Sequence, residues 1–581
     1  MRLRPERVEI EVDGSRRSVE LGGADVIDVG PAAVELRLGE NRTSWSLVNR
    51  GDAPLRVRWV RVVHRVEATG ALRMLRHGYQ SWSRTAVATL GIDRDPSTTP
   101  GSIEMVQGMH HADQRRADDT ELRSEWVTVL ADAGHDVVLA GFEAGADHDG
   151  TWRLASRHDG RVELSAEAFL GDVVLDPGDL RMLHGFVLET GGDASELLDG
   201  WAALVGREGS ARVGQPYQVG WCSWYHYFHG VTEEHLRSNL ARAADWPFEV
   251  FQLDDGYQAA IGDWLQTNGK FPSDLEGIAA RIEAAGRRPG LWLAPFIVAP
   301  DSRVAVDHPD WLARLDNGRP LWGMFNPEWG GGVDGVMYAL DTTQPEVLEH
   351  LEGVARDLVD AGFTYLKLDF TFAPSFDGVW ADARQTPAQR VRAGYDAIRR
   401  GAGNGTFLLG CGAPLSHVVG VVDGNRIGPD VAPSWERSEG GLSLPGYTDV
   451  EPATLHAWVD TLSRSFMHRR LWLNDPDCLM LRTDETAMTP AAVETWARAV
   501  AMSGGMALVS DDLARLDAGA RSLLDEVVRI GREVDAAAQD GPAPRCADLL
   551  AHTIPRRLEA AGYVLDADVA SAASTLQRPV P

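Results

Sequence analysis

The sequence is poor in cysteine and lacks long apolar segments. Its four cysteines lie far apart and form no CxxC pair: Cys222, Cys411, Cys478 and Cys546. This spacing argues against a zinc site and a disulfide framework and is typical of a reducing compartment, so we expect a cytoplasmic protein. We find no apolar run of about 18 residues and no apolar leader, so the sequence predicts neither a membrane span nor a signal peptide.

Basic residues are also few relative to acidic ones. Lys and Arg total 56 against 85 Asp and Glu, which gives a formal net charge of -29. Such a charge argues against a nucleic-acid or anionic-membrane partner, although it says nothing about fold. The length of 581 residues and the 44% hydrophobic content are sufficient for two or three domains with sizeable cores.

The first 200 residues or so contain short alternating segments separated by turn residues, with almost no helical periodicity. This pattern predicts an N-terminal β-sandwich. The predicted strands are Val8–Val12, Ala33–Leu38, Trp45–Val48, Leu55–Val63, Val127–Ala131, Asp136–Phe142 and Arg161–Ala166. The polar and aromatic segment Leu75–Ser83 is either a turn with packed aromatics or a loop that reaches the cleft of the neighbouring domain.

After a linking helix at Ala194–Val205, strands alternate with helices of ten to fifteen residues, which predicts a central (β/α)8 TIM barrel. The predicted barrel strands are Val219–Trp224, Val250–Asp254, Gly290–Phe296, Tyr365–Asp369, Phe407–Cys411, Arg426–Asp430, Leu471–Asn474 and Met506–Ser510. The predicted helices are Glu233–Ala244, Asp274–Ala285, Pro345–Ala361, Pro387–Arg400 and Glu451–Arg464.

Two further segments follow from the same reading. The long span between Phe296 and Tyr365 contains Trp322, Trp329 and Gly330–Gly332, which indicates an elaborated loop near the site. After a helix at Ala518–Ala537 and a proline-rich break, the remaining residues are too few for a full domain, so we expect a strand or two or a partly ordered tail. We therefore expect a sandwich over 1–200, a barrel over 201–515 and a short C-terminal extension over 516–581.

Polar and aromatic residues gather at the predicted carboxyl ends of the barrel strands, where barrels of this kind carry their chemistry. Lys367 and Asp369 share one face of a buried strand, which is costly unless the two form an ion pair or serve a reaction. The sequence has no HxH, HExxH or GxSxG motif, which disfavours a metal hydrolase and a serine nucleophile. Two carboxylates facing each other over a tryptophan-lined pocket favour glycoside hydrolysis.

The ordered set of motifs resembles the α-galactosidases (melibiases) of glycoside hydrolase family thirty-six, most closely the shorter prokaryotic type. The resemblance covers about residues 70 to 515 and rests on Gly220–Tyr225, Leu253–Tyr257, Gly262–Trp264, Lys270–Pro272, Gly290–Phe296, Lys367–Phe370, Arg426–Pro433 and Leu471–Asp477. It implies that the N-terminal part is a β-supersandwich whose Gly78–Trp82 loop reaches the active site. The family's C-terminal β-domain is shortened in this sequence.

The resemblance also implies a retaining exo-glycosidase for small oligosaccharides such as melibiose and raffinose, with no metal or organic cofactor. Asp369 would be the nucleophile and Asp430 the general acid/base. The residues implied in substrate binding are Asp254, Asp255, Trp292, Lys367, Cys411, Arg426, Trp224, Tyr225, Trp82 and Tyr79. Similar enzymes range from monomers to tetramers, so a homo-oligomer is compatible with the resemblance.

Physical chemistry adds requirements to this reading. A retaining pair of carboxyl groups should lie about 5–5.5 Å apart. Asp369 must be ionised, which Lys367 on the same strand face favours. Asp430 must carry a proton, so its site should be dry or close to negative charge, whereas Arg426 would oppose this unless it is turned toward the substrate or Asp369.

Three other functions remain open at this stage. One is a galactosyl-transferring enzyme of the raffinose-synthase kind. A second is a hydrolase of a related α-glycoside, such as an α-N-acetylgalactosaminidase. The third is a catalytically silent carbohydrate-binding protein, against which the completeness of the acidic set argues.

Overall fold

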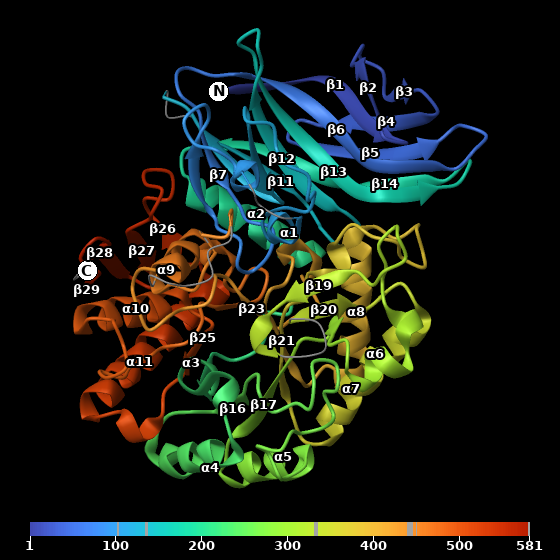
Figure 1. Cartoon of the computed structure of the whole chain (residues 1–581). Coiled ribbons are helices and arrows are strands. Elements are labelled where there is room, and N and C mark those ends of the chain that lie inside the picture. The colour runs from blue at the N-terminus through green and yellow to red at the C-terminus, as the bar shows by residue number, and fades with distance from the viewer. Residues whose placement is uncertain (101–103, 134–136, 330–334, 438–444, 449, 579–581) are drawn as a thin grey trace.

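The computed structural model describes residues 1–100, 104–133, 137–329, 335–437, 445–448 and 450–578. Two antiparallel sheets lie above a parallel barrel, and a small sheet near the C-terminus lies at the side of the barrel (Figure 1). The expected fold class, a β-supersandwich followed by a (β/α)8 barrel and a short extension, is confirmed.

The N-terminal part contains one sheet of six strands and one of eight. The first has the order β2 (Ser15–Glu20), β1 (Arg2–Val12), β6 (Leu55–Glu67), β13 (Val162–Leu175), β12 (Asp149–Ser156) and β9 (Glu121–Glu125). The second has the order β3 (Val26–Val29), β4 (Ala32–Leu38), β5 (Arg42–Asn49), β14 (Leu180–Gly191), β11 (Val137–Phe142), β10 (Val127–Ala131), β7 (Arg73–Arg76) and β8 (Ala86–Thr89). Every ladder in these two sheets is antiparallel, as a sandwich requires.

The alternation of buried and exposed side chains explains which of these strands could be predicted from the sequence. In β1, Val8 and Ile10 are buried while Glu9 between them is half-buried, so the apolar face turns toward the core. Strand β12 is buried along almost its whole length, and short strands such as β3 and β7 give too few residues for a pattern. The elements that the sequence did not predict are β2, β3, β7, β8, β9, β12, β14 and helix α1 (Glu104–His110).

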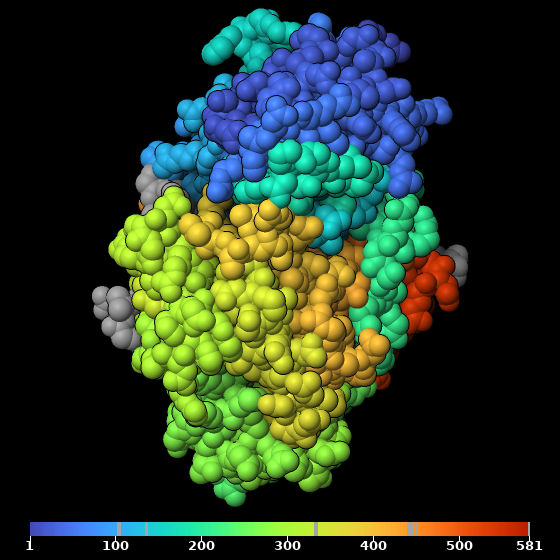
Figure 2. Space-filling view, turned by 90° about the vertical axis from the view of Figure 1, so that its right-hand side faces the viewer, coloured from blue at the N-terminus to red at the C-terminus, as the bar shows by residue number. Residues whose placement is uncertain are grey.

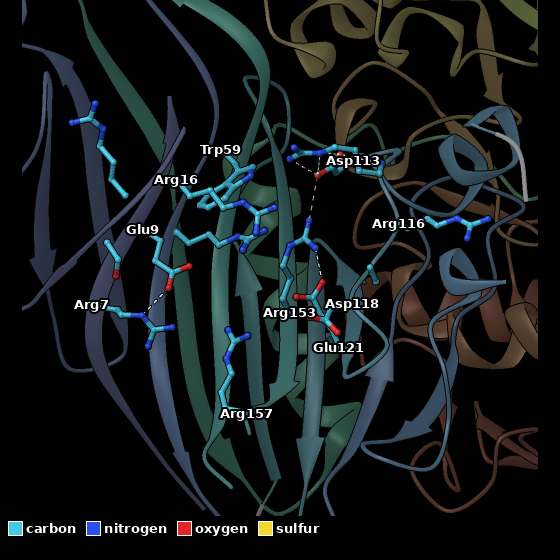
Figure 3. A pocket seen from close by; sticks show the side chains of 15 residues that line it. Arg7, Glu9, Arg16, Trp59, Asp113, Arg116, Asp118, Glu121, Arg153 and Arg157 are labelled. Atoms are coloured by element: carbon cyan, nitrogen blue, oxygen red, sulfur yellow. Dashed lines mark hydrogen bonds and ion pairs between the residues drawn. The ribbon is translucent and has the colours of Figure 1, made fainter. Parts of the chain in front are cut away.

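A hollow of about 690 Å³ on the six-stranded sheet is lined by paired charges (Figure 3). Arg153 lies 2.6 Å from Glu121, and Arg7 lies 2.7 Å from Glu9. The guanidinium of Arg61 lies 3.8 Å from the ring centroid of Trp59. Arg153 on β12 and Glu121 on β9 belong to neighbouring strands, so their ion pair links these strands.

The central barrel has eight parallel strands in the order of the chain. They are β15 (Gln218–Cys222), β16 (Val250–Leu253), β17 (Arg288–Leu293), β21 (Tyr365–Leu368), β22 (Phe407–Gly410), β23 (Gly424–Arg426), β24 (Leu473–Asp475) and β25 (Met506–Val509), and β25 pairs with β15. The seam between β24 and β25 is bridged by Leu479, which donates to Leu508 O at 2.7 Å and accepts from the Ser510 amide at 2.9 Å. The barrel is therefore nearly closed.

Helices follow the strands of this barrel along the chain. They are α3 (Trp224–Tyr227), α4 (Glu233–Arg242), α5 (Leu275–Ala284), α6 (Arg303–Asp307), α7 (Pro345–Asp360), α8 (Pro387–Ala402), α9 (Thr454–Ser463) and α10 (Pro490–Ser503). In α8, Thr386 and Gln389 form a capping box with Pro387 in the first turn, and Val391, Tyr395 and Ile398 form the buried stripe. The predicted helices correspond to α4, α5, α7, α8 and α9, whereas α3, α6 and α10 were not predicted.

Two segments differ from a plain barrel. Between β17 and β21 the chain forms a three-stranded sheet of β18 (Ile297–Val298), β20 (Val336–Ala339) and β19 (Trp322–Phe325). Gly330–Gly332, which we expected in this loop, lie outside the described residues. Beyond α11 (Ala518–Asp540), the chain forms four strands, more than the one or two expected: β26 (Arg545–Cys546), β27 (Arg557–Ala560), β28 (Tyr563–Asp568) and β29 (Ala573–Gln577).

A loop of the N-terminal part is held against the barrel by one arginine. Arg464, which follows α9, is fully buried and donates to Ser81 O at 2.6 Å and Thr85 Oγ1 at 2.9 Å, and also to Gln80 O and Ser83 O. The space-filling view shows the blue and teal N-terminal part, with α2 (Ala194–Glu208), in broad contact with the yellow and orange barrel surface (Figure 2). The two parts are therefore interlocked at this loop.

Within the described ranges, no helix has both the length and the apolar character needed to cross a membrane.

Candidate active site

One pocket of about 260 Å³ lies at the carboxyl ends of the barrel strands. This volume is close to the lower end of the range for ligand pockets, about 300–1,000 Å³, and suits a small ligand. The pocket brings together eight of the residues proposed from the sequence: Trp82, Trp224, Asp254, Asp255, Trp292, Lys367, Asp369 and Asp430. Barrel residues as far apart in the chain as Trp224 and Asp430 thus share one wall because the barrel strands end side by side, and Trp82 joins them from the N-terminal part.

Asp369 follows directly on β21 and is buried. The Trp292 indole donates to its Oδ2 at 2.9 Å, and the Phe370 amide donates to its Oδ1 at 2.9 Å. Burial raises the pKa of the Asp369 carboxyl, and the charges of Asp430 and Asp254 act in the same direction, while Lys367 and Trp292 oppose the rise. The expectation that Lys367 holds Asp369 in the charged form is therefore only partly met, since burial outweighs the lysine.

Lys367 contacts a second carboxylate more closely. Its Nζ lies 3.0 Å from Asp254 Oδ2 and 3.7 Å from Asp369 Oδ2. Burial lowers the pKa of Lys367, but the negative charges of Asp254 and Asp369 oppose burial, and this pKa stays well above its usual value. The lysine is thus a fixed positive charge between the two strand ends that carry Asp254 and Asp369.

Asp255 faces the pocket from the turn after β16. The Trp329 indole donates to its Oδ2 at 2.6 Å, Gln258 donates to its Oδ1 at 2.6 Å, and His229 Nδ1 lies 3.3 Å from its Oδ2. Burial raises the pKa of Asp255, against the opposing effects of His229, Gln258 and Trp329. Neighbouring donors thus fix both oxygens of this carboxylate in one orientation at the pocket wall.

Arg426 and Asp430 form an ion pair instead of lying on one strand. Strand β23 ends at Arg426, so the predicted strand Arg426–Asp430 is wrong in its position, and Asp430 lies in the loop that follows. Arg426 Nη1 donates to Asp430 Oδ1 at 3.0 Å, while Nε donates to Asp475 Oδ2 at 3.1 Å and Nη2 lies 2.8 Å from Asp477 Oδ1. One buried guanidinium therefore serves three carboxylates.

The surroundings of Asp430 differ from those expected for a proton donor. Its side chain is 35% exposed, so the site is wetter than predicted. Arg426 is turned to Asp430 itself, and not to Asp369. Negative charge is nevertheless close, because Asp475 and Asp477 share the same arginine.

Four residues proposed for substrate binding are not in the lining of this pocket as far as the structure describes it. Tyr79 is buried with its ring 5.9 Å from that of His417, at the junction with the N-terminal part. Tyr225 donates its hydroxyl to Asp477, and Arg426 lies beneath Asp430. Cys411 is buried directly after β22. Burial raises the pKa of its thiol well above the usual value, with Asp369 adding to the rise and Arg426 and Lys367 opposing it. Of these four, Arg426 contacts the lining directly, through Asp430.

Several lining residues were not proposed from the sequence. They are Met109, Met324, Phe325, Asn326, Pro327, Trp329, Phe370, Tyr447, Val450 and Pro452. Trp329 belongs to the aromatic span that we expected near the site, and its ring lies 4.9 Å from that of Phe370. Met109 lies on the short helix α1, whose sequence gave no periodic signal. Trp82 and Met109 show that the N-terminal part completes the pocket.

Among the residues that the structure describes, no cluster of three or more His, Cys, Asp or Glu side chains is arranged to hold a metal ion. All four cysteines are buried and unpaired.

Comparison with known proteins places this geometry in context. Residues 215–375 match the Melibiase family model. The chain is 28% identical to α-galactosidase AgaA of Geobacillus stearothermophilus over 155 residues, which is 25% of this chain and 20% of that protein. It is 24% identical to α-galactosidase of Escherichia coli over 136 residues, or 22% of this chain and 18% of that protein. The matched sequence thus spans about a fifth of these curated relatives.

The structural match is longer. TtGalA, an α-galactosidase from Thermus thermophilus solved with p-nitrophenyl α-D-galactopyranoside, superposes with a TM-score of 0.68 at 25% identity, over 96% of this chain and 98% of that chain. The glycoside hydrolase family 36 α-galactosidase AgaA matches with a TM-score of 0.59 at 16% identity, over 93% of this chain and 74% of that chain. The comparisons confirm the expected resemblance: by the sequence of residues 215–375 and the fold of nearly its whole length, the chain is similar to the α-galactosidases of glycoside hydrolase family 36.

Proposed function

We propose that the protein hydrolyses terminal α-D-galactosyl residues of small oligosaccharides, such as melibiose and raffinose, with retention of configuration. The observation that carries this proposal is that Asp369 and Asp430 line one small pocket, together with Lys367, Asp254 and Asp255. The relatives support it, because TtGalA has been solved with p-nitrophenyl α-D-galactopyranoside and with stachyose. We also propose the division into 1–200, 201–515 and 516–581 as domains.

In the first step, an Asp369 oxygen attacks the anomeric carbon, and Asp430 gives its proton to the leaving oxygen. This forms a covalent galactosyl-enzyme. In the second step, Asp430 takes a proton from water, which displaces Asp369 and releases galactose with its original configuration. Trp292 and the Phe370 amide already donate to Asp369, so the carboxylate is oriented before substrate arrives.

Specificity would come from the paired acids after β16. Asp254 and Asp255 are buried, and neighbouring donors fix the oxygens of Asp255. Charged acceptors held in this way form strong hydrogen bonds to sugar hydroxyls and penalise an epimer whose hydroxyl points elsewhere. The tryptophan rings of Trp82, Trp224 and Trp292 offer apolar surface for the C–H face of a sugar.

A panel of nitrophenyl glycosides tests this function. The panel contains α and β anomers of the galacto, gluco and N-acetylgalactosamino sugars. We expect turnover on the α-galactoside, and preference for another sugar or anomer would refute the substrate assignment. Product analysis on melibiose and raffinose separates hydrolysis from galactosyl transfer, and calorimetric binding of galactose without turnover would indicate a silent binding protein.

The Asp369→Asn variant tests the nucleophile. We expect turnover to fall by roughly a thousandfold or more, because a neutral amide cannot form the covalent intermediate. A melting temperature close to that of the wild type would show that the fold is intact. Near-normal turnover in this variant would exclude Asp369 as the nucleophile.

A further inference from the structure

Asp477 is a fully buried carboxylate that the proposed reaction does not use. Its Oδ2 accepts the Val431 amide at 2.9 Å and the Tyr225 hydroxyl. Its Oδ1 accepts the Cys478 amide at 2.7 Å and lies 2.8 Å from Arg426 Nη2. Its φ of 87° is in the left-handed region, which is unfavourable for a residue with a side chain, so the surrounding contacts hold this position.

Two connections lead from Asp477 to Asp430. The first is Arg426, whose Nη2 contacts Asp477 while its Nη1 contacts Asp430. The second is the backbone, because Val431, which donates to Asp477, is the residue directly after Asp430. Asp477 therefore restrains both the guanidinium that Asp430 touches and the peptide from which its side chain projects.

We propose that Asp477 is a positioning residue for the general acid/base, which acts on Asp430 through Arg426 and the Val431 amide. This inference rests on the proposed function and names a further residue for the same reaction. With Asp477 and Asp475 sharing the guanidinium, Arg426 is divided among three carboxylates and does not serve Asp430 alone. The contacts of Arg426 with Asp475 and Asp477 thus hold its guanidinium in one orientation beside Asp430, the side chain that delivers the proton.

The charges around Asp477 agree with this arrangement. The groups that face it are Arg426, Asp430, Asp475 and Tyr225. Burial raises the pKa of Asp477 to about 7, with Arg426 opposing the rise and Asp430 and Asp475 adding to it. The neighbouring carboxylates therefore compete for one positive charge.

The ratio of kcat/KM for two substrates with different leaving groups is a readout that a general loss of folding would not change. Departure of a sugar from melibiose needs a proton from Asp430, whereas nitrophenolate leaves readily without one. A defect in proton donation should therefore lower kcat/KM for melibiose and leave kcat/KM for p-nitrophenyl α-galactoside nearly unchanged. A defect in sugar binding or in folding should lower both.

The main variant is Asp477→Asn, which keeps the size of the side chain and removes its charge. The matched control is Asp511→Asn, because Asp511 is equally buried in the turn after β25 and pairs with Arg482 Nη1 at 2.7 Å. For the Asp477 variant we expect kcat/KM on melibiose to fall by roughly tenfold or more and that on the nitrophenyl substrate to change by less than about threefold. For the Asp511 control we expect kcat/KM to change by the same factor on both substrates.

A second variant covers the case in which Asp477→Asn does not fold. Tyr225→Phe removes one donor to Asp477 and keeps the carboxylate and its pair with Arg426. In this variant we expect kcat/KM on melibiose to fall by about threefold relative to kcat/KM on the nitrophenyl substrate. Equal loss on both substrates in either folded variant, or no loss in both, would overturn the proposal.

The wild type separates this inference from the proposed function. If the wild type turns over neither melibiose nor the nitrophenyl α-galactoside, the proposed function is wrong and the inference falls with it. If the wild type turns over both and the variants keep the ratio of the two kcat/KM values, only the role of Asp477 is refuted.

Discussion

The ammonium of Lys367 lies 3.0 Å from a carboxylate oxygen of Asp254, and both groups are buried. Lys367 is one of two lysines in the 581-residue sequence, the other being Lys270. An ammonium is a compact point charge, whereas a guanidinium is a planar fork. The site therefore uses, between Asp254 and Asp369, a cation that is small enough to contact two strand ends and leave room for a sugar.

Replacing Lys367 by Met should shift the pH dependence of the reaction. Asp369 attacks as a carboxylate, so activity falls when the pH drops below its pKa. Burial already raises this pKa and Lys367 lowers it, so loss of the lysine should raise it further and move the acidic limb of kcat/KM to higher pH. We also expect kcat/KM at the optimum to fall by about a hundredfold, because a preorganised charge is lost.

Lys270→Met is the control for this measurement. Lys270 donates to the backbone carbonyl of His229 and is outside the described lining of the pocket. Its variant should keep the acidic limb in place. An acidic limb that stays unchanged, or moves to lower pH, in the Lys367 variant would contradict the electrostatic role assigned to this lysine.

Trp329→Phe should weaken substrate binding. The variant keeps an aromatic ring beside Phe370 and removes the N–H that donates to Asp255 at 2.6 Å. A hydrogen bond to a charged group contributes about 1.5–3 kcal/mol, so KM for the nitrophenyl α-galactoside should rise by roughly tenfold or more. Trp322→Phe, on the same insertion but 55% exposed, should leave KM unchanged. Equal KM values for the two variants would refute the contribution of Trp329.

Arg464→Met should reduce both stability and activity. The variant leaves the buried carbonyls of Ser81, Ser83 and Ile427 without their donor, which should cost about 3 kcal/mol or more in the free energy of unfolding. Because the same loop carries Trp82 into the pocket, KM should rise as well. Arg529→Met, whose side chain is 53% exposed, should change the free energy by less than about 0.5 kcal/mol. Unaltered unfolding of the Arg464 variant would show that the loop does not depend on this arginine.

The sequence was sufficient to predict which strand ends meet. Asp254 and Asp369 directly follow strands with clear apolar patterns, and Lys367 lies near the end of one of these strands. The strand order of a nearly closed parallel barrel brings such ends together whatever the sequence between them. Trp82 could be proposed because its loop combines polar and aromatic residues and resembles a family motif. These residues were therefore found from local pattern combined with fold class.

Other features depend on tertiary contacts that no local pattern records. Arg426 is the last residue of a strand of only three residues, so the predicted strand ran on to Asp430 and missed their ion pair. Met109 lies on a single short helix, and Tyr447 lies in a long loop. Tyr79 and Tyr225 have the composition of sugar-binding residues, yet packing turns one toward His417 and the other toward Asp477.

The stereochemistry of the first product tests the paired-aspartate mechanism most directly. Proton NMR can follow galactose release from the nitrophenyl α-galactoside before the two anomers interconvert. If Asp369 forms a covalent intermediate that water then opens from the same face, the first galactose detected will be the α anomer. Initial appearance of the β anomer would mean a single displacement by water, and it would contradict the roles assigned to Asp369 and Asp430.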